Sequence, residues 1–368
     1  MERAEVVVIG GGVIGTSIAF HLAEAGVDVL LVERGELASG STSKAAGGVR
    51  AMFSDELNVR MGLRDLDAWQ AFAERPGWEV DFEQVGYLFL LTREGDVTQF
   101  ERAVAMQNSL GLPSRMLAPE EAGRLSPLAG LDGVLAAALC PRGGLATPEA
   151  AVQGYAAGAR RHGARLRRDC AVTGIECEGG ELRCVRSEAG PVETRAVICA
   201  AGVWSAEVGA MARLDLPVTP ERRRVAYTGP LDDLPERVPM TIDFETGFYF
   251  HREGPGLLFG TSDVCETQDE WLERAAPLLE RRAPMLLEAP IAGGWSGLYE
   301  MTPDHNALIG EAPAPSRFLY ATGFSGHGFQ QAPAVGEIVR DLYLGRQPFV
   351  NVAPLAAGRP ERRELGVV

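Results

Sequence analysis

The start of the chain shows a strand–helix–strand pattern. Residues 6–9 are a continuous run of β-branched apolar side chains, and residues 27–32 form a second, largely apolar run. Short runs of this kind are typical of strands that are buried on both faces of a parallel sheet. Between them, Ala19 and Leu22 lie at helical spacing, and Gly26 stands where a C-cap glycine ends a helix. The pattern therefore predicts one β-α-β unit.

Further elements are predicted along the rest of the chain. Pro148 stands at the first position of a predicted helix, and apolar residues at helical spacing predict another helix over 335–342. Alternating apolar runs at 87–91 and 248–250 are typical of a mixed or antiparallel sheet. The acidic, proline-containing residues 231–239 are expected to form a surface loop.

The composition is that of a globular protein. The chain has 368 residues, of which 46% are hydrophobic and 23% are charged, a balance that excludes a disordered or fibrous protein. Because a single core rarely grows past about 250–300 residues, we expect two domains or one large one. Asp and Glu number 50 against 35 Lys and Arg, so the formal net charge is −15. This acidic balance argues against a nucleic-acid partner or an anionic membrane surface.

Cysteine usage and the N-terminus favour a reduced, cytoplasmic location. The six cysteines include no Cys-x-x-Cys pair and have no histidine at zinc-ligand spacing, so neither a metal site nor a disulfide framework is expected. No run approaches the roughly 20 apolar residues of a membrane span. The first residues carry mixed charge and do not resemble a signal peptide. We therefore expect a cytoplasmic protein without a membrane span.

The turn after the first predicted strand reads Gly-x-Gly-x-x-Gly at Gly10, Gly12 and Gly15. In a dinucleotide-binding unit the first glycine permits the tight turn, the second lets the backbone approach the pyrophosphate, and the third allows close helix packing. The helix N-terminus attracts the phosphates, and Glu33 can accept hydrogen bonds from the ribose. We expect a dinucleotide site, with a glycine-rich turn of another α/β fold as the alternative. The motif alone does not separate NAD from FAD.

The next segment separates them by resemblance. Glu33 and Arg34, with residues 38–50, resemble the flavin-contacting loop of the D-amino-acid oxidase/sarcosine oxidase family of FAD-dependent amine oxidoreductases. Further segments similar to this family extend over nearly the whole chain: 148–163, 171–175, 196–205, 299–310 and 320–342. The last two closely resemble the sarcosine oxidase β and proline dehydrogenase β subunits.

The resemblance implies an α/β protein with two domains. A Rossmann-type FAD-binding domain of the glutathione-reductase kind would take residues 1–80, 144–216 and 300–368. A substrate-binding domain built on a mixed or antiparallel sheet would take residues 81–143 and 217–299.

The glycine motif and the resemblance together predict a set of FAD-contacting residues. Most of them lie in turns that follow predicted strands. The set is Gly10, Gly12, Val13, Ile14, Gly15, Glu33, Arg34, Ser41, Thr42, Ser43, Lys44, Ala46, Gly47, Gly48, Val172, Ala200, Ala201, Gly202, Trp204, Gly323, Gly326, His327, Gly328, Phe329 and Gln330. For Lys44, the only lysine, a solvated surface position is the alternative.

Three residues are candidates for the chemistry. Arg50 matches the arginine that holds the substrate carboxylate in monomeric sarcosine oxidase, and a guanidinium suits that task; a surface arginine is the alternative. His327 is expected to order the flavin-facing turn or contact the flavin, with a general-base role as the alternative. Tyr249 is expected to line the substrate cavity or to pack in the core. His305 resembles a family position near the flavin ring, or stabilises a turn.

The chain departs from monomeric sarcosine oxidase at several positions. Gly297 replaces the cysteine that tethers the flavin, and Thr42 and Ser43 offer no histidine for attachment, so we expect non-covalent FAD. Leu258 replaces an oxygen-activating lysine, which favours a dehydrogenase over an oxidase. Gln330 replaces a second carboxylate-binding lysine, which puts sarcosine itself in doubt as the substrate.

The leading hypothesis is an FAD-dependent oxidoreductase that oxidises sarcosine, proline, glycine, a D-amino acid or a similar amine by hydride transfer from the α-carbon to flavin N5, giving an imine. One alternative is an FAD-dependent 2-hydroxy-acid dehydrogenase, with His327, His305 or His251 as the base. Another is a non-catalytic FAD-binding assembly protein, because residues 326–333 also resemble a complex I assembly flavoprotein of this family. The expected partners are a small carboxylated amine and either oxygen or a redox partner. A homodimer and a heteromeric subunit both agree with the family.

Overall fold

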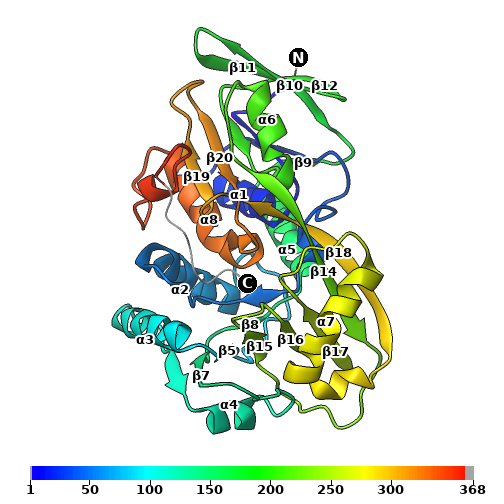
Figure 1. Ribbon diagram of the computed structural model, residues 1–368. Coiled ribbons are helices and arrows are strands. Elements are labelled where there is room, and N and C mark those ends of the chain that lie inside the picture. The colour runs from blue at the N-terminus through cyan, green and yellow to red at the C-terminus, as the bar shows by residue number, and fades with distance from the viewer. Residues whose placement is uncertain (1, 361–368) are drawn as a thin grey trace.

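The computed structural model describes residues 2–360, and its first large sheet occupies the upper half of Figure 1. This six-stranded sheet has the order β19-β20-β13-β2-β3-β9. Its strands are β2 (Val6–Ile9), β3 (Val29–Val32), β9 (Arg165–Arg167), β13 (Val197–Cys199), β19 (Leu308–Glu311) and β20 (Phe318–Thr322). All pairs are parallel except β19 with β20. Every residue of β2 and β3 is buried, as expected for strands covered on both faces.

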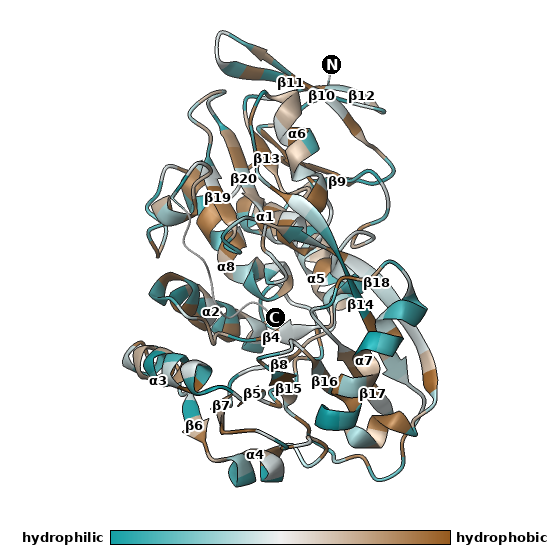
Figure 2. Cartoon of the chain, in the orientation of Figure 1, coloured by the Kyte–Doolittle hydropathy of each residue, from teal (hydrophilic) through white to brown (hydrophobic). Residues whose placement is uncertain are grey.

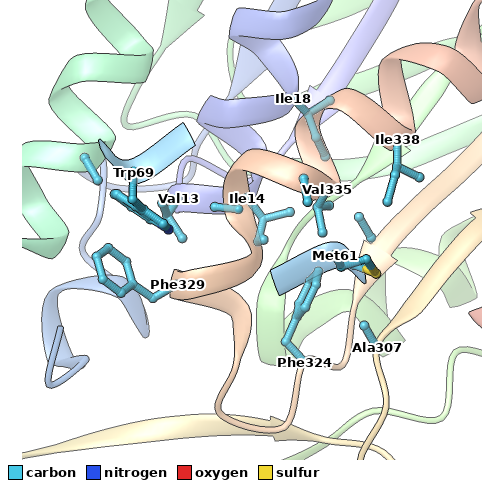
Figure 3. Packing of buried hydrophobic residues seen from close by; sticks show 14 of the residues in the cluster. Val13, Ile14, Ile18, Met61, Trp69, Ala307, Phe324, Phe329, Val335 and Ile338 are labelled. Atoms are coloured by element: carbon cyan, nitrogen blue, oxygen red, sulfur yellow. The ribbon is translucent and has the colours of Figure 1, made fainter. Parts of the chain in front are cut away.

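Three helices pack together beside this sheet: α1 (Val13–Glu24), α5 (Pro148–Arg161) and α8 (Gly328–Tyr343). Helix α1 is buried from Val13 to Ala23 because α5 and α8 both pack against it. Figure 3 shows Ile14 of α1 close to Val335 of α8 within this core. Helix α2 (Glu56–Gln70) adds Trp69, whose ring centroid lies 4.9 Å from that of Phe329. This packing fixes the direction of the first turns of α1 and α8.

A four-stranded sheet at the top of Figure 1 has the order β1-β12-β11-β10. Its strands are β1 (Glu2–Arg3), β10 (Val172–Glu178), β11 (Glu181–Ser187) and β12 (Gly190–Glu193). Helix α6 (Ser205–Met211) packs against β10. The start of β10 and the preceding residues reach the same cavity as the ends of the parallel strands.

The second large sheet has eight strands in the order β18-β14-β17-β16-β15-β5-β7-β6. Its strands are β5 (Tyr87–Leu91), β6 (Arg115–Leu117), β7 (Ala136–Cys140), β14 (Thr219–Thr228), β15 (Met240–Asp243), β16 (Tyr249–Glu253), β17 (Gly256–Gly260) and β18 (Ile291–Met301). β15 pairs with β5 in parallel, and the other neighbours are antiparallel. The sheet is therefore mixed, one of the two arrangements, mixed or antiparallel, that the alternating sequence pattern predicted.

The outer elements of this half are helices α3 (Glu94–Ser109), α4 (Pro119–Leu125) and α7 (Gln268–Arg282). Trp271 and Leu279 of α7 pack into one core with Phe250 and Phe259 of the sheet. In Figure 2 much of the α7 ribbon is teal, whereas β20 in the first sheet is mainly brown. The apolar residues Trp271, Ala275 and Leu279 of α7 are buried. The polar side of α7 thus faces solvent, as in an ordinary amphipathic surface helix.

The remaining elements are short. They are the paired strands β4 (Gly48–Val49) and β8 (Gly144–Leu145) and the 3₁₀ helices η1 (Thr42–Lys44), η2 (Gly202–Trp204), η3 (Pro284–Leu287) and η4 (Ala353–Leu355). Residues 231–239 form no helix or strand, as expected for a loop. Within the part of the chain that the structure describes, no helix is long and apolar enough to cross a membrane, and no group of His, Cys, Asp and Glu could hold a metal.

The α/β class with a second, mixed sheet is confirmed. The eight-stranded sheet draws all its strands from residues 87–140 and 219–301, and the other two large sheets take theirs from the rest of the chain. The division into domains at 1–80, 144–216 and 300–368 stays a prediction, and its residues 361–368 lie outside the described residues.

Candidate active site

One large cavity begins at the carboxyl ends of β2, β3 and β13 and extends to the eight-stranded sheet. In parallel α/β sheets this end of the strands is where nucleotides bind. From the other sheet, Tyr87, Met240 and Tyr249 line the same cavity. A ligand that extends from one sheet to the other would therefore contact both parts of the protein.

The glycine motif packs α1 tightly on the sheet. Gly10 has a φ of +117°, and a Cβ there would lie 2.2 Å from the carbonyl oxygen of Ala200. A Cβ on Gly15 would lie 1.9 Å from the carbonyl oxygen of Gly10. Neither position has room for a side chain, so both need glycine. The tight turn and the close helix packing expected from the motif are both present.

The N-terminus of α1 faces the cavity without a capping side chain. Gly12 is the N-cap residue, and the first turn of the helix holds no acidic residue. The Thr42 hydroxyl accepts a hydrogen bond from the Val13 N–H at 3.1 Å and thereby ties the next loop to the helix. Because a helix N-terminus carries partial positive charge and Gly12 adds no side chain there, this end fits the pyrophosphate of a dinucleotide.

Glu33 has a structural task that the sequence did not reveal. Its carboxylate accepts hydrogen bonds from the N–H of Gly11 at 2.6 Å and the N–H of Gly35 at 2.9 Å. It also lines the cavity at the end of β3, where the ribose-binding acid of a dinucleotide unit is expected. Glu33 therefore holds the glycine turn in place, and it also lies where a dinucleotide unit has its ribose-binding acid.

Most of the predicted FAD-contacting residues line this one cavity. They are Gly10, Gly12, Val13, Ile14, Glu33, Arg34, Ser41, Thr42, Lys44, Ala46, Gly47, Gly48, Val172, Ala200, Ala201, Gly202, Trp204, Gly326, His327, Gly328, Phe329 and Gln330. Three predicted contacts lie outside the lining. Gly15 is covered by the Gly10 carbonyl, Ser43 lines a neighbouring cavity, and Gly323 is a turn residue with a φ of +69°.

Two further contacts lie at the edge of the cavity, near η1 and η2. The guanidinium of Arg34 lies 3.7 Å from the ring centroid of Trp204, a cation–π contact at the edge of the cavity. Lys44 is exposed, and its carbonyl oxygen accepts a hydrogen bond from the indole N–H of Trp295 at 3.1 Å. A Cβ on Gly297 would lie only 2.6 Å from the Cβ of Lys44. Glycine at 297 thus lets the segment around Lys44 lie directly on β18.

Arg50 and His327 meet inside the cavity. Nη2 of Arg50 lies 2.9 Å from Nε2 of His327, and Nη1 donates to the carbonyl oxygen of Met52. The backbone N–H of Arg50 donates to Oε1 of Gln330 at 3.0 Å. Arg50 is only 4% exposed, so it is a buried cavity-lining cation and not a surface arginine.

His327 is neutral at pH 7. Burial lowers its pKa well below the ordinary value, and the charges of Arg50 and His305 lower it further. Because a guanidinium can only donate hydrogen bonds, Nε2 of His327 must be the acceptor and its ring proton must sit on Nδ1. The lone pair that a general base would use is therefore engaged by Arg50, which favours a positioning role.

Tyrosines of the eight-stranded sheet form the wall opposite the glycine motif. Tyr87, Tyr249 and Tyr299 all line the cavity. A Cβ on Gly48 would lie 2.5 Å from the Tyr87 hydroxyl, and one on Gly260 would lie 2.4 Å from the Tyr249 hydroxyl. Burial raises the pKa of Tyr87 to about 12 and the pKa of Tyr249 well above its ordinary value. These hydroxyls therefore stay protonated and can donate hydrogen bonds to a ligand.

Arg223 is a site residue that the sequence analysis missed. It lies on β14 and lines the cavity, with its guanidinium 5.5 Å from the ring centroid of Tyr299. Its neighbours Arg222 and Arg224 bond instead to Ser296 and to the loop before α7. Alternation of side chains along a strand would have placed one of the three arginines on the opposite face. That was the only signal in the sequence.

The other candidate histidines lie away from the cavity lining. His305 has a φ of +61°, and its N–H donates to the Thr302 carbonyl at 3.2 Å, as in a turn. His251 is buried and lines the neighbouring cavity together with Leu258. Burial lowers the pKa of His251 to about 4, so it is neutral at pH 7.

Comparisons with known proteins identify the family of this chain. A model of the family described as FAD dependent oxidoreductase matches residues 5–342. Mitochondrial dimethylglycine dehydrogenase of Mus musculus is 31% identical over 97% of this chain, but the match takes in 44% of that protein. FAD-dependent oxidoreductase domain-containing protein 1 of Bos taurus is 30% identical over 97% of this chain and 85% of that protein.

Solved structures show the same fold. L-proline dehydrogenase from P. horikoshii has a TM-score of 0.89 and 34% identity, covering 94% of this chain and 95% of that one. Glycine oxidase from Geobacillus kaustophilus has a TM-score of 0.86 and 25% identity, covering 98% of this chain and 100% of that one. This chain spans less than half the length of the dimethylglycine dehydrogenase that it matches. The resemblance seen in the sequence is confirmed: the chain belongs to the FAD-dependent oxidoreductase family, and FAD is its cofactor.

Proposed function

We propose that this protein oxidises a small amino acid or secondary amine that carries a carboxylate. The observation that carries the proposal is the buried Arg50 beside the neutral His327, in the same cavity as the dinucleotide motif. A buried guanidinium suits a carboxylate because charge-assisted hydrogen bonds to carboxylates are strong. Dimethylglycine, proline and glycine, the compounds in the names of the related proteins, each combine an amine with a carboxylate.

The protein's part in the reaction is binding and orientation. Bound FAD supplies the hydride acceptor for the substrate's α-carbon. Arg50 holds the substrate carboxylate, while the protonated hydroxyls of Tyr87 and Tyr249 donate hydrogen bonds within the cavity. The aromatic rings exclude water from the reacting atoms. Burial of the amine lowers its pKa, which favours the neutral form; loss of a hydride from that form gives an iminium ion, the protonated form of the imine.

The arrangement of histidines supports an amine over a 2-hydroxy acid. Oxidation of an alcohol needs a base for the hydroxyl proton. Nε2 of His327 is engaged by Arg50, and His251 and His305 lie outside the cavity lining. An amine that binds in its neutral form needs no such base.

Two finer features belong to the same proposal. FAD is bound non-covalently, because Gly297 stands against Lys44 with no room for a tethering side chain. The electron acceptor is a redox partner in preference to oxygen, because Leu258 replaces the oxygen-activating lysine of monomeric sarcosine oxidase. The cytoplasmic location and the homodimeric or heteromeric state stay predictions.

The test is an anaerobic titration of the purified yellow protein with amines, amino acids and 2-hydroxy acids. Bleaching of the flavin band by sarcosine, proline, glycine, dimethylglycine or a D-amino acid is the expected result. Slow recolouring on admission of air would support the dehydrogenase. Bleaching only by hydroxy acids would overturn the amine proposal, and a complete panel without bleaching would favour the non-catalytic alternative.

A further inference from the structure

The cavity holds a second arginine that the proposed reaction does not use. The Arg223 side chain is 16% exposed and lines the same cavity as Arg50. Its Nη2 pairs with Oε1 of Glu221 at 2.5 Å. Its Nε and Nη1 are buried and have no hydrogen-bond partner. The guanidinium is thus held at one nitrogen and retains donors at the other two.

Buried donors without partners are rare in folded proteins, because each costs the free energy of its lost hydration. When they occur on a charged group that lines a cavity, a ligand of opposite charge is the physical remedy. The ring of Tyr299, 5.5 Å from the Arg223 guanidinium, supports the side chain from one side. Arg223 is therefore held in place before any ligand binds.

Tyr299 also links the two arginines. Burial raises the pKa of its hydroxyl, and the charges of Arg223 and Arg50 both act to lower it, so the ring lies within electrostatic reach of both. The carboxylate of Glu300, which lines the cavity too, accepts hydrogen bonds from Thr322 at 2.8 Å and Gly323 at 2.9 Å. Its pKa is raised by burial, which favours its neutral form. The substrate part of the cavity thus presents two guanidinium groups around one tyrosine.

We propose that Arg223 forms a second anion-binding subsite and that the substrate is an amine with two carboxylates, one held by Arg50 and the other by Arg223. This inference rests on the proposed amine oxidation and narrows its substrate class. Iminodicarboxylic acids and N-alkylated acidic amino acids have this pattern of charges. A substrate with one carboxylate would leave the free donors of Arg223 without a partner.

The test compares two unreactive thioethers on the FAD-loaded protein. Methylthioacetate carries one carboxylate and thiodiacetate carries two, and neither has an amine to oxidise. Binding is followed as the change in the absorbance spectrum of the oxidised flavin, with the dissociation constants of both probes measured in the wild type and in Arg223→Gln. The control is Arg222→Gln, which removes an arginine from the same strand whose side chain bonds to Ser296 outside the cavity.

The wild type and Arg222→Gln should bind thiodiacetate about tenfold or more tightly than methylthioacetate, as expected for hydrogen bonds to a charged group. Arg223→Gln should remove this preference and leave the methylthioacetate constant within about twofold. Equal binding of the two probes by the wild type, equal weakening of both by Arg223→Gln, or no spectral change with either probe would overturn the subsite. If Arg223→Gln changed only the rate at which the flavin recolours in air, the subsite would also be overturned. Arg223 would then act in the reoxidation of the flavin and not in substrate binding.

Anaerobic bleaching separates this inference from the function on which it rests. Iminodiacetate should bleach the flavin at a lower concentration than sarcosine does, and Arg223→Gln should remove that difference. If sarcosine or another monocarboxylic amine is preferred by the wild type, amine oxidation stands and the second subsite fails. If no amine bleaches the flavin, the proposed function fails, and the thioether constants still decide whether Arg223 binds a carboxylate.

Discussion

Nη2 of Arg50 lies 2.9 Å from Nε2 of His327, although 277 positions separate the two residues in the chain. His327 is the N-cap residue of α8, and Arg50 directly follows β4. Burial and the nearby arginine both keep the histidine uncharged. A neutral acceptor orients a guanidinium without cancelling its positive charge.

Replacing His327 should distinguish positioning from base catalysis. His327→Gln keeps an acceptor near Nη2 of Arg50, whereas His327→Ala removes it. We expect His327→Ala to raise the KM for the amine about tenfold, as for a lost hydrogen bond to a charged group, and His327→Gln to restore most of this loss. A fall in kcat of several orders of magnitude in both variants, with FAD still bound, would instead identify a base.

Arg50 should be the main anchor for a carboxylate. In Arg50→Lys the charge remains, but the planar arrangement of donors is lost, and these two cations are not equivalent at such sites. We expect the dissociation constant for methylthioacetate to rise about tenfold or more, with the flavin content unchanged. An Arg50→Lys protein that binds this probe as tightly as the wild type would contradict the assignment of Arg50.

The glycine motif gives a prediction about stability. Gly15→Ala places a Cβ 1.9 Å from the Gly10 carbonyl oxygen, so α1 must move away from the sheet. We expect a clear fall in Tm and in flavin content, because overpacking a tight contact typically costs about 1–3 kcal/mol. Gly95→Ala is the control, because a Cβ at that helical position meets no atom within 4 Å. Equal Tm values for the two variants would argue against the tight contact.

Buried histidines should make the apoprotein sensitive to acid. Burial lowers the pKa of His21 to about 3 and of His251 to about 4, from an ordinary value of 6.5. At a pH between the folded pKa of each histidine and the ordinary value of 6.5, the unfolded chain binds a proton at that histidine that the folded protein does not bind. The free energy of unfolding therefore falls as the pH drops from 6.5 towards 4, by up to about 1.4 kcal/mol per pH unit for each histidine.

Urea unfolding of the apoprotein at pH 7.5, 6.5, 5.5 and 4.5 measures this dependence. His21→Leu and His251→Leu should each show a shallower loss of stability below pH 6.5 than the wild type. Asp65 acts in the opposite direction, because burial raises its pKa and protonation favours the fold. Asp65 is present in the wild type and in both variants, so its contribution is the same in all three proteins. The comparison is therefore between their slopes of unfolding free energy against pH. Two variants with the wild-type slope would contradict the prediction.

Non-covalent attachment of FAD predicts a simple chemical result. Precipitation of the holoprotein with acid should release all the yellow flavin into the supernatant, because Gly297 offers no side chain to a covalent bond. Flavin that stays with the precipitate after washing would show a covalent link. Peptide mapping of that flavin would then identify the residue that carries it.

Much of the nucleotide-binding half could be predicted from the sequence, because its signals are local. The apolar runs that form β2 and β3, the glycines between β2 and α1, and Glu33 at the end of β3 lie within one short segment. Each acts through its own backbone geometry or through immediate neighbours. The eight-stranded sheet was predicted only as mixed or antiparallel, because β15 pairs with β5 across more than a hundred residues and no local pattern specifies that partner.

The sequence by itself determined the tight turn between β2 and α1, because only glycine tolerates the close backbone contacts at Gly10 and Gly15. The tertiary structure alone decided the substrate end of the cavity. It set Arg50 against His327 from separate segments, and it turned Arg223 inward while its neighbours face elsewhere. The physical reason is that strand pairing and burial, which assign each side chain to a face of the sheet and shift its pKa, arise only when distant segments pack together.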